Sequence, residues 1–326
     1  DEGELTLADL SKLPGRFGYI AFAPQWDFLD LITTAASRYP TFRLLMEAEA
    51  TGLIREGNAV RGLKYRDKEG EHELRATLTV AADGRHSVLR RAAGLVPREL
   101  GAPMDVLWFR LPRACGDPDD TFLRISAGHL MVAINRETYW QLAYVIPKGG
   151  FDRLRGQGID AFREPVARLL PFLRDRVGQI AGYDDVSVLT VALNRLVRWH
   201  RDGFLCIGDA AHAMSPVFGV GINLAVQDAV AAANLLAAPL RAGGPIPEST
   251  LRALQRRRTL PTVVTQFAQR AVQDRVISPA LERGGRPPRI PDLSKIPLLG
   301  AIPRRFVGLG IRPEHVRTPD TSGRPA

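Results

Sequence analysis

Apolar and polar positions alternate with period two along three consecutive runs in the first part of the chain, residues 43–55, 59–66 and 71–78. The segments Glu56-Gly57-Asn58 and Asp67-Lys68-Glu69-Gly70 separate these runs. Alternation of this kind is typical of half-buried strands, and Gly or Asn in a short gap favours a hairpin. The pattern therefore predicts a three-stranded antiparallel meander.

A second group of alternating runs lies in the middle of the chain and predicts an antiparallel sheet. Its members are residues 105–111, 122–125, 130–135 and 139–146, followed by a strand near 186–192. Helical spacing of apolar residues predicts helices elsewhere. Their expected ranges are 25–35, 159–173, 174–181, 229–240 and 248–276. We expect the ordered part to close at Pro279. The remainder is rich in Pro, Gly and Arg, and we expect it to wrap along the body or to be partly disordered.

Two further runs are continuously apolar, residues 78–82 and 204–207, and each leads into an acidic residue beside a glycine. Continuous apolar runs of this length predict strands buried in a parallel sheet. Ligands of open α/β sheets bind at the carboxyl ends of such strands. Asp83 and Asp209 are therefore candidate ligand-binding residues.

The stretch after Asp209 passes through a Pro- and Gly-rich turn into an Ala-rich helix. The Asp209 carboxylate could accept hydrogen bonds from the hydroxyls of a polyol chain, while Gly219 and Gly221 allow the backbone to approach a flat ring. The free N–H groups and the positive end of the helix favour negative charge, which a reduced flavin carries at one ring edge. This arrangement suits a flavin.

This stretch contains Gly-Asp-Ala-Ala-His at 208–212, then Pro216, Gly219-X-Gly221-X-Asn223 and Asp228. It resembles the second flavin motif of the single-component FAD-dependent monooxygenases, the p-hydroxybenzoate hydroxylase-like family. The segment 83–90, Asp-Gly-Arg-His-Ser-Val-Leu-Arg, is similar to the middle motif of that family. The resemblance implies a set of cofactor-binding residues, which are Gln25, Asp83, Gly84, His86, Arg90, Gly208, Asp209, Pro216, Gly219, Val220, Gly221, Ile222 and Asn223.

Several of these residues keep an alternative interpretation. The resemblance places His86 and Arg90 where NAD(P)H approaches, but a salt bridge that holds a helix to the sheet explains Arg90 at least as well. Gln25, which the resemblance places near the flavin's sugar-phosphate side, is also an ordinary helix-start residue. We expect His212 to be a structural part of its turn, and no catalytic residue is assigned.

The resemblance implies an α/β fold, with an FAD-binding doubly wound parallel sheet, an inserted antiparallel substrate domain and a C-terminal helical segment. The expected divisions are 1–98 and 201–240 for the FAD-binding domain, 99–200 for the substrate domain, and 241–326 for the C-terminal helix and basic tail. The family normally opens with a strand running into Gly-X-Gly-X-X-Gly, which this sequence lacks. We therefore expect a sheet incomplete at its N-terminus, and a chain that binds FAD poorly alone.

In the family the inserted sheet roofs the flavin and forms the substrate pocket. The reaction implied is hydroxylation or epoxidation with NAD(P)H and O₂, and the apolar composition of the sheet suggests a hydrophobic or aromatic small molecule. Halogenation is disfavoured because a Trp-X-Trp-X-Ile-Pro signature is absent. Six pocket candidates, each equally well explained as core or surface, are Trp108, Arg110, Met131, Trp140, Gln141 and Tyr144.

Composition limits the other possibilities. Of 326 residues, 45% are hydrophobic and 24% charged, as in ordinary soluble proteins, and no signal peptide is visible, so the expected location is the cytoplasm. The two cysteines are far apart and support neither a disulfide framework nor a zinc site, and no metal is expected.

All of the net charge of +9 lies in the C-terminal part, since residues 241–326 contain 16 Lys+Arg against 6 Asp+Glu and the rest of the chain is close to neutral. This tail could contact an anionic membrane surface weakly, but a solvated basic segment explains it better, and no nucleic-acid partner is expected. The alternative function is a non-catalytic flavoprotein fragment or binding module with a basic tail.

Overall fold

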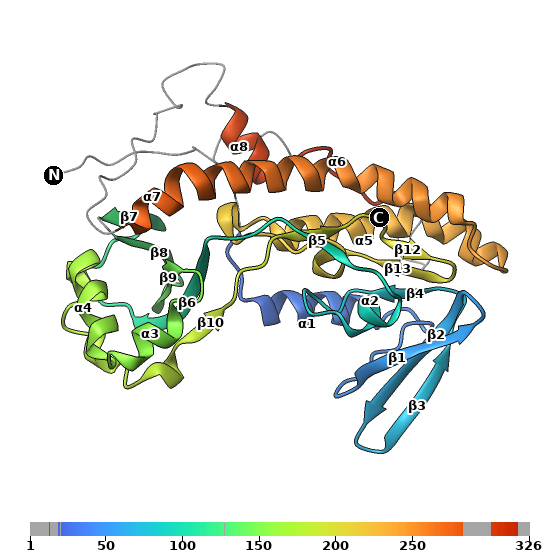
Figure 1. The fold of residues 1–326 in the computed structure, drawn as a ribbon, viewed down its shortest axis with the longest axis horizontal. Coiled ribbons are helices and arrows are strands. Elements are labelled where there is room, and N and C mark those ends of the chain that lie inside the picture. Colours follow the sequence, from blue (N-terminus) through green and yellow to red (C-terminus); the bar gives the residue numbers. More distant parts are fainter. Residues whose placement is uncertain (1–12, 14–18, 20, 127, 283–300, 319–326) are drawn as a thin grey trace.

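The computed structural model describes residues 13, 19, 21–126, 128–282 and 301–318. The meander is confirmed, as strands β1 (Glu49–Glu56), β2 (Ala59–Asp67) and β3 (Gly70–Arg75) pair antiparallel in that order. Its first strand begins at residue 49 rather than 43, because a turn with positive φ at Glu47 interrupts the run. Figure 1 shows this sheet projecting from the body as a separate lobe.

The second sheet has five strands in the order β10-β6-β9-β8-β7. All pairs are antiparallel, as predicted. The strands are β6 (Met104–Pro112), β7 (Phe122–Ser126), β8 (His129–Asn135), β9 (Tyr139–Pro147) and β10 (Ser187–Leu189).

Helices α3 (Phe151–Gly156) and α4 (Asp160–Leu169) pack on one face of this sheet, where Leu107, Leu142 and Phe162 are fully buried. The expected helix at 174–181 is wrong, because the chain there forms a turn followed by one short 3₁₀ turn, Val177–Gln179. Gly178 lies inside that turn, and glycine is a poor helix former.

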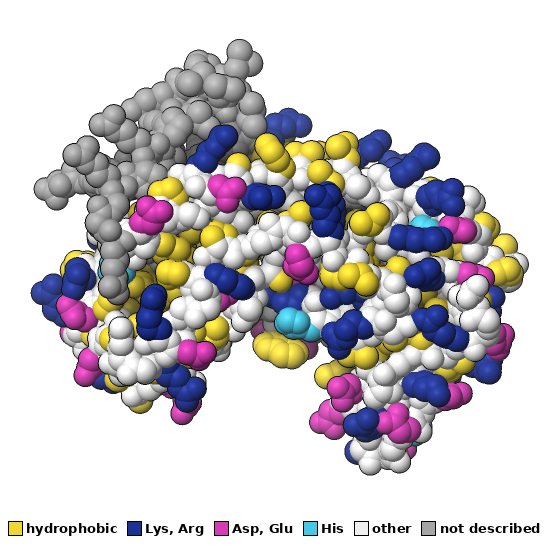
Figure 2. Space-filling view, viewed as in Figure 1, with side chains coloured by type: hydrophobic (Ala, Val, Ile, Leu, Met, Phe, Trp, Pro, Cys, Tyr) yellow, Lys and Arg dark blue, Asp and Glu magenta, His cyan; other side chains and the backbone are white. Residues whose placement is uncertain are grey.

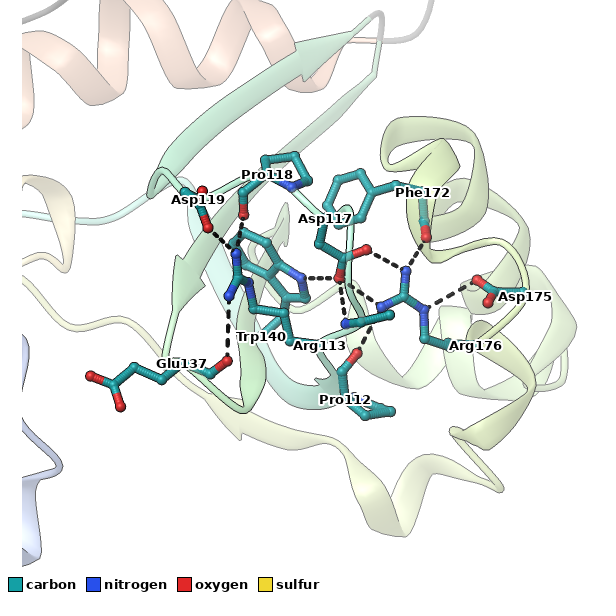
Figure 3. A network of polar contacts seen from close by, with 11 residues as sticks. Pro112, Arg113, Asp117, Pro118, Asp119, Glu137, Trp140, Phe172, Asp175 and Arg176 are labelled. Atoms are coloured by element: carbon teal, nitrogen blue, oxygen red, sulfur yellow. Dashed lines mark hydrogen bonds and ion pairs between the residues drawn. The ribbon is translucent and has the colours of Figure 1, made fainter.

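A buried polar network fixes the end of this sheet to the turns beside it (Figure 3). Arg176 binds both oxygens of Asp117 at 2.7 Å, and the Trp140 indole donates to the same carboxylate at 2.8 Å. The side chains of Arg176 and Asp117 are only 9% and 4% exposed. Despite the opposing effect of burial, the Arg176 guanidinium holds the pKa of Asp117 well below its usual range.

The remaining strands join distant parts of the chain. Strand β13 (Phe204–Cys206) pairs parallel with β4 (Thr79–Ala81) and antiparallel with β12 (His200–Arg201), while β5 (Pro97–Glu99) pairs with β11 (Asn194–Leu196). Within the described residues, β4 and β13 form the parallel part of the sheet. The predicted fold class is confirmed, with the five-stranded sheet inserted between these two strands.

Two long helices, α5 (Gly221–Ala242) and α6 (Glu248–Val272), run side by side along the body (Figure 1). A π-helical turn (Gln273–Ile277) and α7 (Ser278–Leu281) continue α6, so Pro279 lies inside a helix rather than after the last one. Helix α8 (Ala301–Gly308) and the following residues to 318 lie against α5 and α6, as expected of a segment that wraps along the body. The rest of the predicted tail lies outside the described residues.

Helix α1 (Gln25–Ala36) also forms as predicted, but none of its residues is buried. Trp26 and Leu31 are 72% and 68% exposed. Figure 2 shows the molecule hollowed between the lobe of the meander and the lobe of the five-stranded sheet. The ribbon of α1 runs between these lobes in the same view (Figure 1).

Candidate functional site

The pairing of β4 with β13 brings the two acidic motifs together. Cys206 lies opposite Ala81 in parallel register, and the Ile207 amide donates to the Ala81 carbonyl at 3.0 Å. Asp83 and Asp209 therefore follow adjacent strands at the same edge of the sheet, as the sequence predicts. Arg85 supports this juxtaposition, since it lies 3.7 Å from the Asp209 carboxylate.

Asp209 lies in a 3₁₀ turn (Gly208–Ala210), and its side chain is 31% exposed. Burial raises the pKa of its carboxyl, while the nearby Arg85 and His212 act in the opposite direction. The carboxylate thus has one flank open to solvent. It is suited to accept hydrogen bonds from a ligand that covers it.

Asp83 is already engaged within its own loop. The Ser87 hydroxyl donates to one carboxylate oxygen, and the Leu89 amide donates to the other at 3.1 Å. Ser87 caps helix α2 (Val88–Ala92) by accepting from the Arg90 amide. Gly84 has a φ of 80° and open space where a Cβ would stand, so the backbone here is accessible. Asp83 shapes the loop, and its direct contact with a cofactor stays a prediction.

Arg90 is 5% exposed and joins the two motifs. Its guanidinium donates to the Ala210 carbonyl at 3.0 Å and to the Arg85 carbonyl at 2.8 Å. These partners are backbone carbonyls and not the carboxylate that the salt-bridge interpretation of Arg90 requires. His86, by contrast, is exposed, with its carbonyl bound by the Arg91 side chain at 2.7 Å. Of the two residues predicted to meet NAD(P)H, His86 is the accessible one.

The Gly-rich turn leaves the start of helix α5 open. Pro216 precedes a 3₁₀ turn, Gly219 has a φ of 65°, and no side chain in the described structure caps α5 at Val220. Val220 is buried, whereas Ile222 and Asn223 in the first helical turn are exposed. Free amides at the positive end of a 22-residue helix are suited to an acceptor that carries negative charge.

Gln25 is the first residue of α1, follows Pro24 and is exposed. The structure gives no hydrogen bond between it and the motif residues that are described. Its role beside the cofactor stays a prediction.

A buried ionic cluster lies directly beneath the Gly208-Asp209 turn. Asp228 of α5 accepts from the Gly208 amide at 3.0 Å, binds His212 Nε2 at 2.6 Å and accepts from Arg258 Nε at 2.8 Å. The three side chains are at most 1% exposed. Burial acts to raise the pKa of Asp228, but His212 and Arg258 outweigh it and hold this pKa below its ordinary value. His212 is structural, as expected.

Three glutamines of α6 and its π-helical extension hold the next part of the turn, and sequence reasoning missed them. Gln266 donates to the Ala213 carbonyl at 3.3 Å, Gln269 to the Ser215 carbonyl at 2.8 Å, and Gln273 to the Ser215 hydroxyl at 2.8 Å. Residues 258, 262, 266, 269 and 273 share one buried face. The signal available in the sequence was the helical spacing of these polar residues, which indicates a polar face on the helix.

The six substrate-pocket candidates divide between the two faces of the five-stranded sheet. Met131, Trp140 and Tyr144 belong to the core under α3 and α4, so for these three the structure supports the core interpretation over the pocket interpretation. Trp108 is on the opposite face, where it packs with a cluster that includes Val217 of the Gly-rich turn. The other two candidates, Arg110 and Gln141, lie opposite each other on β6 and β9 and share the face of Trp108.

A cavity of about 690 Å³ lies away from these residues. It is a groove between α6 and the segment 197–200, and it contains none of the predicted site residues. Arg198 and Arg252 on its wall both pair with Glu248, at 2.7 and 3.0 Å. Its size alone assigns it no ligand.

Residues 4–268 match a family described as FAD binding domain. This chain belongs to that family. The sequence resemblance to FAD-dependent monooxygenases is therefore confirmed, and FAD is the cofactor that the family supports.

Curated relatives agree with the family. A 6-methylpretetramide 4-monooxygenase from Streptomyces rimosus is 33% identical over 235 residues, covering 72% of this chain and 56% of the relative. A digeranylgeranylglycerophospholipid reductase from Methanopyrus kandleri is 30% identical over 235 residues, covering 69% and 60%. The chain thus spans somewhat more than half the length of these relatives.

Solved structures share the fold. OxyS anhydrotetracycline hydroxylase from Streptomyces rimosus aligns with a TM-score of 0.68 at 18% identity, covering 91% of this chain and 59% of that one. PqsL, a probable FAD-dependent monooxygenase from Pseudomonas aeruginosa, aligns with a TM-score of 0.63 at 22% identity, covering 76% and 68%. At these identities the likeness concerns the fold alone.

One described segment, Val217–Ala242, is long and apolar enough to cross a membrane by length and composition. One such helix is weak evidence for a membrane span. In the structure this segment contains Asp228, whose carboxylate is fully buried between His212 and Arg258. These contacts favour a helix packed within the protein.

The residues at the strand ends fit an FAD molecule. Asp209 offers a partly exposed carboxylate for hydroxyl groups, and the uncapped amides of α5 offer a site for negative charge. Gly84 and Gly219 leave the backbone open where a flat or charged group could approach. All three features lie on the elements that the two motifs share.

Proposed function

We propose that this chain forms the FAD-binding and substrate-binding parts of an NAD(P)H-dependent monooxygenase. Its substrate would be a hydrophobic or aromatic small molecule, which it would hydroxylate or epoxidise with O₂. The observation that carries the proposal is the parallel pairing of β4 with β13, which places both sequence motifs at one edge of the sheet. The family match over residues 4–268 supports the cofactor.

In this proposal each motif has a separate task. Asp209 accepts hydrogen bonds from the sugar-alcohol chain of FAD, and the first turn of α5 stabilises negative charge on the flavin ring. The loop from Asp83 to Arg90 fixes the neighbouring backbone through its internal hydrogen bonds. When bound, FAD supplies the redox chemistry, which is acceptance of hydride and reaction with O₂.

The five-stranded sheet would supply the substrate pocket from the face that carries Trp108. That face packs with Val217 of the Gly-rich turn and, over part of its area, with the π-helical turn and α7, whereas the opposite face is filled by α3 and α4. Leu189 and Val132 extend the same apolar surface. A pocket there would exclude water and favour an apolar substrate. These roles correspond to a division of the chain into the FAD-binding domain (1–98 and 201–240), the substrate domain (99–200), and the C-terminal helix and basic tail (241–326).

NAD(P)H would approach the loop that bears His86, because this side chain is exposed while Arg90 is buried. Arg90 would act by holding the Arg85 and Ala210 backbones in place. We further propose a cytoplasmic location, with at most a weak membrane-surface contact through the basic tail.

The proposal is tested by titrating the protein with FAD and following NADH- or NADPH-dependent bleaching of the flavin absorbance under anaerobic conditions. Binding, followed by bleaching that accelerates with an aromatic ligand, is the expected result. Bound flavin that neither NADH nor NADPH reduces would refute the NAD(P)H-dependent activity. Weak FAD binding is compatible with the proposal, because the sequence lacks the Gly-X-Gly-X-X-Gly turn. A folded protein with no measurable FAD binding even at high flavin concentration would refute the whole proposal.

A further inference from the structure

The segment after α8 inserts a carboxylate between two arginines of α6. The Glu314 side chain is 1% exposed and accepts from Arg257 Nε at 2.6 Å and Arg257 Nη2 at 2.7 Å. It also lies 3.6 Å from Arg258 Nη1. Burying a carboxylate is unfavourable unless cations and donors compensate, so this contact is a specific one.

Arg258 transmits this contact to the flavin motif. Its side chain is fully buried, and its Nε donates to Asp228 at 2.8 Å. Its two terminal nitrogens have no hydrogen-bond partner in the described part of the chain. Glu314 is thus the second carboxylate that balances this buried cation. Asp228 in turn holds the Gly208 amide and His212.

Helix α8 contacts the other half of the motif. Phe306 meets Phe218 edge-on with ring centroids 5.5 Å apart. Val307 packs against the cluster of Met214, Val220 and Leu224. Residues 301–318 therefore contact the Gly-rich turn through apolar side chains and the Gly208-Asp209 turn through a chain of charges.

We propose that Glu314 is a positioning residue for the flavin site, and that residues 301–318 complete that site from the C-terminal side. The inference rests on the proposed binding of FAD. Without the Glu314 charge, Asp228 alone balances Arg258, and the carboxylate is drawn toward the guanidinium. Its bonds to Gly208 and His212 weaken, so the turn that presents Asp209 opens more often.

The test compares Glu314→Gln with Asn234→Ala. Asn234 donates to the His315 carbonyl at 2.8 Å and accepts from the Arg317 amide at 2.9 Å. It therefore anchors the same segment to α5 without taking part in the chain of charges. Glu314→Gln keeps the side-chain volume and removes the charge, so the pair separates electrostatic positioning from simple docking.

Amide hydrogen exchange of the peptide 204–214 is measured in the flavin-free protein, and the Kd for FAD is measured by flavin fluorescence. We expect Glu314→Gln to raise both the exchange rate and the Kd on the order of tenfold, and Asn234→Ala to leave both within about twofold. If Glu314→Gln fails to fold, Glu314→Asp, which keeps the charge on a shorter side chain, replaces it with a smaller expected increase.

Equal effects of the two variants, or unchanged exchange in Glu314→Gln, would overturn the positioning role. The exchange measurement does not depend on flavin, so its result stands apart from the proposed function. Faster exchange without FAD binding in any variant would support the coupling of Glu314 to the turn and refute the flavin assignment.

Discussion

Replacement of Asp209 by alanine is the most direct test of the flavin site. Each hydrogen bond to a charged group contributes about 1.5–3 kcal/mol to binding. We expect Asp209→Ala to weaken FAD binding by about this amount, which raises the Kd by a factor of roughly 10 to 150. The lower half of this range applies if only one flavin hydroxyl donates, since the carboxylate is 31% exposed.

The same substitution should not destabilise the protein. Burial raises the pKa of the Asp209 carboxyl, so the folded state disfavours its charged form. Arg85, its neighbour at 3.7 Å, keeps a hydrogen bond to the Thr190 carbonyl at 3.1 Å after the change. We therefore expect an unchanged or slightly higher melting temperature in Asp209→Ala, measured without flavin.

Asp83→Asn provides the matched control, because this carboxylate accepts bonds from Ser87 and Leu89 within its own loop. It should lower the melting temperature of the flavin-free protein, in contrast to Asp209→Ala. The assay is a fluorescence titration of FAD with the wild type and both variants, alongside thermal unfolding followed by circular dichroism. An Asp209→Ala protein that retains the wild-type Kd would show that the Gly-Asp turn does not hold the cofactor.

Three further predictions concern the neighbouring loop, the inserted sheet and one turn. His86→Ala should slow NAD(P)H-dependent flavin reduction in stopped-flow traces and leave reoxidation by O₂ unchanged. Arg90→Ala should slow the reduction and also lower the melting temperature. Equal slowing of reduction and reoxidation by His86→Ala would contradict a role of His86 in NAD(P)H binding. Asp117→Asn should cost about 3–5 kcal/mol in urea unfolding because Arg176 loses its buried partner, and a loss below 1 kcal/mol would contradict the ionic role. Because the folded pKa of Asp117 is depressed, its contribution is complete above about pH 4 and is lost as the pH falls further, which the wild type should show and Asp117→Asn should lack. Gly203→Ala should lower stability by at least about 2 kcal/mol, since φ is +69° and a Cβ would lie 2.0 Å from a backbone carbonyl oxygen; an unchanged melting temperature would refute the strain.

The sequence predicted those features that depend on neighbouring residues. Alternation located the meander and the inserted sheet, and two continuous apolar runs located the parallel pair. The cap that Ser87 provides for α2 is a contact of the same local kind, because capping involves residues three apart. The position of Asp209 after its strand followed from the same local reasoning.

Contacts between distant segments were not accessible in this way. Nothing near Asp228 indicates that Arg258 would reach it from α6, or that Glu314 would reach Arg258 from the C-terminal segment. The set of pocket candidates could, however, have been narrowed from the sequence. Trp140 and Gln141 are adjacent in one strand, so they point to opposite faces and could not both line one pocket.

The parallel pairing of β4 with β13 also determines when the site can form during synthesis. Its three-residue register joins Ala81 to Cys206, with the whole inserted sheet between them in the chain. At a ribosomal rate of roughly 5–20 residues per second, β4 waits about 6–25 s for its partner to be made. The inserted sheet, whose strands pair mostly with near neighbours, can form in that interval. The site therefore assembles late, after the inserted domain. A mutation that slows folding of the inserted sheet would delay formation of the site without changing any residue in it.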